Sequence, residues 1–182
     1  MRIRGLEWKD FPAMVDTYFA LYDEVQTDPE VGISLFPQKP SFADEIEWFA
    51  SLFRSVHEGA AVAVIAEEEG RAVGHCAVRP NSGPESRHVG VLGLLVDQKW
   101  RAKGIGRALM IEALAQSRGK FEMVELSVFA TNAHARRLYE SLGFRRWGTL
   151  PNGLRRNGRY IDHEWMVLQL SPPAQGAGPS NR

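Results

Sequence analysis

The chain has 182 residues, about the length of one ordinary domain, and 44% of them are hydrophobic, which is enough for a conventional core. Its 22 Lys and Arg balance 22 Asp and Glu, which excludes a strongly basic nucleic-acid binder as an interpretation of the whole chain. Cys76 is the only cysteine, no apolar run approaches the ~20 residues of a membrane span, and MRIRGLEWKD lacks the apolar centre of a signal peptide. We therefore expect a cytoplasmic protein that binds neither nucleic acid nor membranes.

The first half of the chain predicts a strand, two helices and a hairpin. Strands are expected at 2–7, 60–67 and 71–79, with a turn at Glu69-Gly70 between the last two, and helices at 10–25 and 41–56. Asp10 is the predicted N-cap of the first helix, and Ser41-x-x-Asp44 is a capping box that opens the second. Residues 28–40 read as a long loop with three prolines.

The second half continues the mixture of strands and helices. Strands are expected at 88–96, 123–130, 144–150 and 159–170, and helices at 104–118 and 132–142. Asn132 is a predicted N-cap, Gly143 a helix stop and Asn157-Gly158 a hairpin turn. The strand at 88–96 is apolar on both faces, which predicts a central place in the sheet.

The resulting order is β-α-α-β-β-β-α-β-α-β-β, with one strand–helix–strand unit inside a mainly antiparallel set. This order predicts a mixed α/β (α+β) fold rather than a doubly wound one. Residues 1–170 form one predicted domain. Residues 171–182 are rich in Pro, Gly and Ser and predict a flexible tail.

A glycine turn follows the central strand after four residues, in RAKGIGR at 101–107. Gly104 and Gly106 leave the backbone bare, the start of a helix supplies unpaired N–H groups, and basic side chains flank both glycines. Together they predict a site for a pyrophosphate or a similar anion. A P-loop is excluded because no GK[ST] follows, and a dinucleotide fingerprint is disfavoured because Leu109 replaces its third glycine. A loop that merely needs glycine is the remaining alternative.

At this point the sequence resembles the GNAT superfamily of acetyl-CoA-dependent N-acetyltransferases. RAKGIG matches that superfamily's pyrophosphate turn, Arg/Gln-x-x-Gly-x-Gly/Ala. VLGLLVDQKW looks like its fourth strand, and SVFATNAHARRLYESLGF looks like its fifth strand and fourth helix. LRRNGRYIDHEWM is similar to the last hairpin of bacterial members that acetylate free amino acids. The resemblance implies the GNAT fold, a mixed and mainly antiparallel sheet whose parallel strands 4 and 5 splay apart, with flanking helices.

The resemblance also implies how acetyl-CoA, the cosubstrate, would be held. The residues expected to bind it are Leu94, Leu95, Val96, Arg101, Ala102, Lys103, Gly104, Ile105, Gly106, Arg107 and Asn132. Backbone N–H near Leu95 or Val96 would stabilise the oxyanion, and Tyr139 would be the catalytic proton donor to the sulfur. Ordinary alternatives stand beside these roles, since Tyr139 also fits an apolar helix stripe and Asn132 fits a plain N-cap.

The general base is the weakest element of the pattern. Many superfamily members carry a Glu on the fourth strand, but the comparable stretch here, Val91-Leu92-Gly93, has no carboxylate. The remaining candidates are Asp23, Glu24, Asp162 and Glu164, or water without a dedicated base. His88 lies about 26 Å of extended chain from Val96, too far for chemistry. With no metal-ligand spacing among the five histidines, we expect no metal site.

Acceptor recognition would fall to the first two helices, the 28–40 loop and the last hairpin. Phe36, Trp48 and Phe49 are candidates for an apolar pocket, with core packing as the alternative. Arg155, Arg156 and Arg159 are candidates for binding a carboxylate, with plain exposure as the alternative.

The leading hypothesis is acetylation of a small primary amine such as an amino acid. The alternatives are acetylation of a protein N-terminus or lysine, and a non-catalytic acetyl-CoA-binding module. Dimers are common in the superfamily, so a homodimer is an open expectation.

Overall fold

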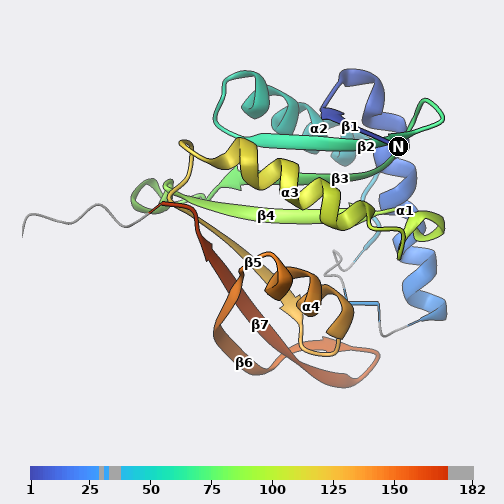
Figure 1. The fold of residues 1–182 in the computed structure, drawn as a ribbon. Coiled ribbons are helices and arrows are strands. Elements are labelled where there is room, and N and C mark those ends of the chain that lie inside the picture. Colours follow the sequence, from blue (N-terminus) through green and yellow to red (C-terminus); the bar gives the residue numbers. More distant parts are fainter. Residues whose placement is uncertain (29–30, 33–37, 172–182) are drawn as a thin grey trace, which may run out of the picture.

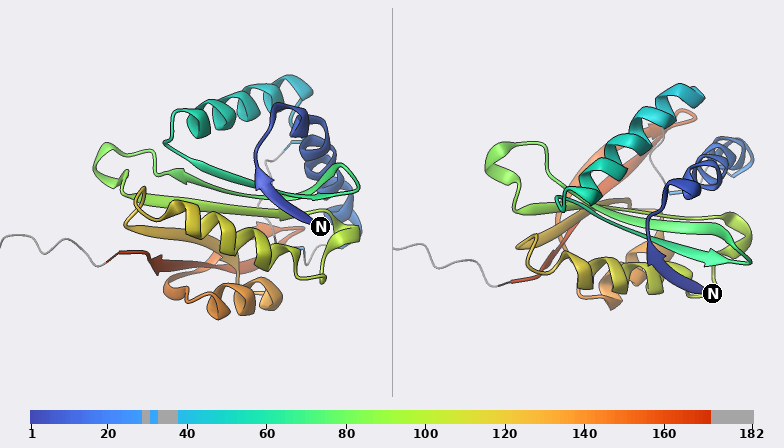
Figure 2. Two further views of the ribbon diagram at one scale, coloured as in Figure 1. Left: turned by 45° about the horizontal axis from the view of Figure 1, so that its top comes forward. Right: turned by 90° about the horizontal axis from the view of Figure 1, so that it is seen from above.

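The computed structural model describes residues 1–28, 31–32 and 38–171, and it places one seven-stranded sheet between two pairs of helices (Figures 1 and 2). The strands are β1 Arg2–Gly5, β2 Val62–Glu68, β3 Arg71–Pro80, β4 Val89–Val96, β5 Met123–Phe129, β6 Arg145–Arg156 and β7 Arg159–Gln169. The α-helices are α1 Phe11–Thr27, α2 Phe42–His57, α3 Ile105–Ser117 and α4 Ala133–Ser141. Phe36 and all of the predicted tail beyond Ser171 lie outside the described residues.

The sheet order is β1-β2-β3-β4-β5-β7-β6, and every neighbouring pair is antiparallel except β4 and β5. β4 pairs with β5 only from Val89↔Met123 to Val91↔Glu125. Beyond that point β4 continues beside β3, whereas β5 follows β7 as far as Phe129↔His163. Figure 1 shows the two halves of the sheet separating there. The predicted central position of strand 88–96 and the mixed, mainly antiparallel sheet are confirmed.

Helices cover both faces of the sheet (Figure 2), and each face carries its own apolar core. On one face, α3 packs on β2, β3 and β4 around Leu109, Met110 and Ala113, which are fully buried. On the other face, α1 and α2 pack on the sheet, and Phe49 and Leu52 of α2 are buried beneath them. The predicted pocket residue Phe49 is therefore a core residue, at 1% exposed. Within the described ranges, no helix has the length and apolar character needed to cross a membrane.

Several predicted local signals are present in the structure. The Ser41 hydroxyl accepts a hydrogen bond from Asp44 N–H, and the Asp44 carboxylate accepts one from Ser41 N–H at 2.8 Å. Asn132 caps α4 by accepting from Ala135 N–H at 3.0 Å. Asn157 has φ 49° and Gly158 φ 77°, the left-handed pair that a tight β6–β7 hairpin turn requires.

Two local predictions need correction. Asp10 precedes α1, but its carboxylate does not cap that helix; it accepts two hydrogen bonds from the Arg4 guanidinium, at 2.6 and 2.7 Å, and one from Glu7 N–H. The Arg4 side chain is only 6% exposed, and a buried cation without a counter-charge costs more free energy than a missing helix cap. β6 also extends to Arg156 instead of ending at residue 150, because Asn152 takes φ 55° and donates its N–H to Asp162, so pairing resumes at Leu154 after an irregularity.

Gly90 tests how tightly the base of the β4–β5 opening is packed. A Cβ at Gly90 would lie 2.5 Å from Val78 Cγ1 and 3.1 Å from the Phe121 ring. Gly90→Ala should therefore lower the free energy of unfolding, measured in urea, by about 1–3 kcal/mol. Gly93→Ala is the matched control on the same strand, since nothing lies within 4 Å of its added Cβ. Equal stability of the two variants would contradict this description of the packing.

Candidate functional site

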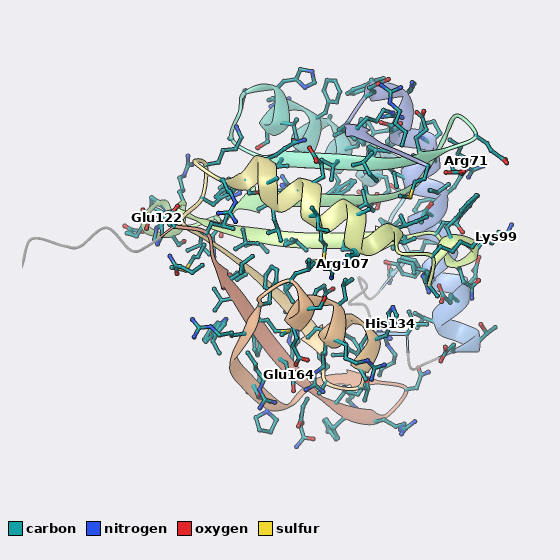
Figure 3. The ribbon with its side chains drawn as sticks, viewed as in Figure 1. Arg71, Lys99, Arg107, Glu122, His134 and Glu164 are labelled. Carbon is teal, nitrogen blue, oxygen red and sulfur yellow. The ribbon has the colours of Figure 1, made fainter. Side chains whose placement is uncertain are left out.

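The separation of β4 from β5 opens a cleft of about 820 Å³. Residues 92–96 of β4 form one edge and residues 126–129 of β5 form the other. The start of α3, part of α4 and the end of α1 complete its walls, and Arg107 and His134 lie on opposite sides of the opening (Figure 3). Tyr139 and every residue predicted from the sequence to bind the cofactor line this cleft, apart from Lys103.

The ladder between β3 and β4 determines which amides of β4 face the cleft. Asn81 N–H donates to Val89 O and Asp97 N–H to Val73 O, each at 2.9 Å, so odd-numbered residues of this segment bond to β3. Because antiparallel partners alternate, Leu95 directs its backbone groups to His75, while Leu94 and Val96 direct theirs toward the opening. Of the two amides predicted as oxyanion donors, the one that faces the cleft is therefore that of Val96.

The glycine turn places the start of α3 at the mouth of the cleft. Ala102 and Gly104 both have left-handed backbone, with φ 59° and 80°. Gly104 is the N-cap of α3 and has no side chain to occupy the first N–H groups, while Ala108 N–H already bonds to Gly104 O at 3.1 Å. A Cβ on Gly104 would meet nothing within 4 Å. The first turn of a 13-residue helix thus presents free donors and the positive end of its dipole to open space.

The three cations of the turn have different environments. Lys103 Nζ lies 4.4 Å from the centre of the Trp100 ring, outside the cleft lining. Arg107 is exposed, lines the cleft and donates to the Ser141 hydroxyl at 2.8 Å. Arg101 instead donates to Glu24 of α1 and to the Val96 carbonyl oxygen. Among the described residues, Arg107 is thus the basic side chain of the turn that lines the cleft and makes no ion pair to a carboxylate.

Tyr139 and Asn132 both face the cleft from α4, as their seven-residue spacing predicts. Burial, with a smaller contribution from the neighbouring Cys76, raises the pKa of the Tyr139 hydroxyl to about 12, so the hydroxyl keeps its proton at neutral pH. The Asn132 amide has two contacts, since it also donates to Gly32 O at 3.3 Å. It therefore caps α4 and ties α4 to the segment that follows α1.

The predicted bases occupy different places. Glu164 lies on the α4 side of β7, 5% exposed, with Arg136 Nε at 2.9 Å and Arg146 at 3.0 Å (Figure 3). The Arg136 contact is an ion pair whose angle does not suit a hydrogen bond. Asp162 accepts from Asn152 N–H in the last hairpin. Asp23 is exposed, and Glu24 lines the cleft but is paired with Arg101.

Sequence reasoning missed groups that only the sheet register places near β4. His75 pairs with Leu95 across β3 and β4 and lies 6.2 Å from Trp48, ring centre to ring centre. Burial lowers its pKa to about 4, so the imidazole on the α2 side of the sheet stays neutral at pH 7. Trp48, a candidate for an apolar pocket, is 37% exposed and does not belong to the described residues that line the cleft. Further cleft residues that sequence patterns did not suggest are Leu21, Trp100, Ser127, His134, Arg137 and Leu138.

The three arginines of the last hairpin, Arg155, Arg156 and Arg159, differ in their contacts and exposure. Arg156 donates to Val31 O, and its guanidinium lies 4.7 Å from the Phe129 ring centre; both Val31 and Phe129 line the cleft. Desolvation lowers the Arg156 pKa. Arg155 is exposed and lies over the Tyr160 ring, and Arg159 is also exposed. Of these three arginines, Arg156 is therefore the one that contacts residues of the cleft wall.

Comparison with known proteins agrees with this geometry. The L-amino acid N-acetyltransferase AaaT of Escherichia coli is 34% identical over 101 residues, which cover 54% of this chain and 62% of that protein. The crystal structure of ribosomal-protein-alanine N-acetyltransferase from Brucella melitensis superposes with a TM-score of 0.79 at 26% identity, over 93% of this chain and all of that one.

A phosphinothricin acetyltransferase of Sinorhizobium meliloti, solved in complex with AcCoA, superposes with a TM-score of 0.80 at 20% identity, over 98% of this chain and 95% of that one, and supports the fold alone. The profile of the acetyltransferase (GNAT) family matches residues 17–144. This match covers more than half of the sequence, and the splayed strands and the glycine turn agree with it. The chain belongs to the GNAT acetyltransferase family.

Proposed function

We propose that this protein transfers the acetyl group of acetyl-CoA to the nitrogen of a small primary amine, such as an amino acid. The observation that carries the proposal is the divergence of β4 from β5 after Val91 and Glu125. It leaves the Leu94 and Val96 backbone groups directed into a cleft that ends at the start of α3. An edge of unpaired peptide groups suits an extended ligand that itself contains amides, and a helix N-terminus suits a phosphate.

The residues around the cleft fit acetyl-CoA in this orientation. The pantetheine amides would pair with the Leu94 backbone groups, as a further strand would, which leaves the Val96 N–H for the thioester. The pyrophosphate would take the first N–H groups of α3, beside Gly104 and Gly106, with Arg107 as the adjacent cation. Acetyl-CoA supplies the activated thioester, and the remaining chemistry requires donors at fixed positions.

Two donors on this chain suit acyl transfer. The Val96 N–H would donate to the thioester carbonyl oxygen as it gains negative charge during attack by the neutral amine. The Tyr139 hydroxyl would donate to the sulfur as the carbon–sulfur bond breaks. The nitrogen loses one proton and the sulfur finally gains one, so the products are an N-acetylated amine and coenzyme A.

The segment after α1 favours a small acceptor. Asp28, Val31 and Gly32 line the cleft, and Gly32 and Val31 are tied to α4 and to the last hairpin through Asn132 and Arg156. A segment attached at these points narrows the space that an extended peptide would need. Arg156 beside Phe129 places a cation where an acceptor carboxylate could bind. The relative named as an L-amino acid acetyltransferase agrees with this class.

The decisive experiment measures thiol release from acetyl-CoA with panels of amino acids, polyamines and peptides. Amino acids should give the highest kcat/KM. A preference for peptides would favour the protein N-terminus or lysine alternative, the class named for the Brucella neighbour. Coenzyme A binding without thiol release for any amine would favour a non-catalytic binding module.

Gly106 tests the position of the pyrophosphate. In the protein alone, an added Cβ makes only ordinary contacts, 3.4 Å from Leu94 Cδ2 and 3.6 Å from Leu138 Cδ2. Gly106→Val should therefore fold normally but weaken coenzyme A binding, measured by calorimetry, by about tenfold or more because its methyl groups enter the ligand's path. Gly106→Ala is the control and should bind nearly as well as the wild type. Unchanged affinity in the valine variant would show that the phosphates bind elsewhere.

Tyr139 tests the proton donor. Tyr139→Phe should lower kcat about 100-fold while the coenzyme A dissociation constant stays within about twofold, because only the hydroxyl is lost. Tyr160→Phe, at a tyrosine that is 62% exposed on β7, should leave both values unchanged. Steady-state kinetics and calorimetry on the same preparations separate the two effects. Wild-type kcat in the Tyr139 variant would remove this residue from the mechanism.

A further inference from the structure

The first residue of the glycine turn is held away from the anion site. Arg101 Nη2 donates to Glu24 Oε2 at 2.8 Å, Nη1 donates to Glu24 Oε1, and Nε donates to the Val96 carbonyl oxygen at 3.0 Å. The guanidinium thus makes a bidentate pair with α1 and a third bond to the end of β4. The Glu24 side chain is only 9% exposed.

We propose that Arg101 is a positioning residue, which latches the glycine turn to α1, and that it does not bind the pyrophosphate. This proposal rests on the proposed function, because it concerns how the same cleft is held in shape. Arg101, Glu24 and Val96 all line that cleft, so the latch lies at its wall.

The charges favour a latch over a phosphate contact. If Arg101 swung toward a phosphate, Glu24 would be left largely buried and without its cation, which is costly. The carboxylate would also lie beside an incoming anion and repel it. Arg101 and Glu24 neutralise each other, and Arg107 with the α3 N-terminus supplies the positive field for the ligand.

The backbone shows what the latch holds. Ala102, the residue that follows Arg101, has φ 59°, a conformation that is unfavourable for a residue with a Cβ. Such strain persists where surrounding contacts over-determine the backbone. The three Arg101 bonds fix the chain immediately before this residue, and Gly104 at φ 80° then directs α3 toward the cleft. The Val96 carbonyl is satisfied by the same side chain, which fixes the peptide group next to the proposed oxyanion donor.

The latch also connects the two substrate sites. Glu24 lies one helical turn before Asp28, and Asp28, Val31 and Gly32 line the acceptor side of the cleft. Losing the pair should therefore loosen both the turn that meets the cofactor and the segment that meets the acceptor.

Glu24→Gln separates the latch from a direct phosphate contact. If Arg101 bound phosphate, this change would free the guanidinium, and coenzyme A would bind equally or more tightly. A latch predicts that Glu24→Gln and Arg101→Gln each weaken coenzyme A binding by about tenfold, and that the double variant is no weaker than the worse single variant. Arg101→Lys should behave like Arg101→Gln, because an ammonium cannot form the bidentate pair.

The controls distinguish positioning from general destabilisation and from loss of charge. Asp16 lies on the same helix as Glu24, and Asp16→Asn breaks its exposed pair with Arg71 of β3 and should leave coenzyme A binding unchanged. Arg107→Gln should reduce the salt dependence of binding, whereas Glu24→Gln should lower affinity and leave that dependence unchanged. Calorimetry across a salt series, with melting temperatures of each variant, measures all of these.

The outcomes are distinct. Wild-type protein that fails to bind coenzyme A refutes the proposed function itself. Wild-type binding combined with full affinity in Glu24→Gln refutes the latch alone. Equal losses in Glu24→Gln and Arg101→Gln, without further loss in the double variant, support it.

Discussion

The divergence of β4 from β5 is the constraint on which the rest of the site depends. A sheet normally satisfies each strand's peptide groups on both edges, and here β4 loses its second partner after Val91 while β5 keeps β7. The exposed edge requires other hydrogen-bond donors and acceptors. One is already present, since the Arg101 guanidinium takes the Val96 carbonyl oxygen. The Leu94 and Val96 amides remain directed into the cleft, so an anchored fold and a binding edge arise from the same separation.

Holding this opening requires both faces of the sheet. On one face, Leu138 and Tyr139 of α4 pack against the core that α3 forms with β4 and β5, which fills the space beneath the separated strands. On the other face, the end of α1 reaches across to the turn through Glu24. The β5–β7–β6 half is attached to the segment after α1 by Asn132 and Arg156. The two halves of the sheet are thus connected across the cleft by side chains, where backbone pairing is lost.

Sequence patterns predicted the features that depend on residues close together in the sequence, such as helix caps and turns. Ser41, Asn132 and the Asn157-Gly158 turn each satisfy backbone groups within three residues, so their roles are legible without the fold. The glycine turn and the Asn132–Tyr139 spacing are likewise local patterns, and the residues that they predicted for the site line the cleft, apart from Lys103. Contacts that depend on the fold were not predictable in this way. Arg101 and Glu24 are 77 residues apart in the sequence, and Asp10 pairs with the buried Arg4 guanidinium instead of capping α1. Choosing between the Leu95 and Val96 amides required the β3 register, which alternation in one strand does not supply.

The acidity of the Tyr139 hydroxyl indicates that the proposed reaction would depend on hydrogen-bond donors in fixed positions and not on a strong acid. A phenol with a pKa of about 12 is a weaker acid than an ordinary thiol, whose pKa is about 8.5. In the proposed reaction, Tyr139 would therefore not give its proton completely to a departing thiolate, and its contribution would be a charge-assisted hydrogen bond. The Val96 N–H would likewise donate without releasing a proton. Both donors would work only if they stand where charge develops, so the proposed catalysis depends on how rigidly α4 and the end of β4 are held.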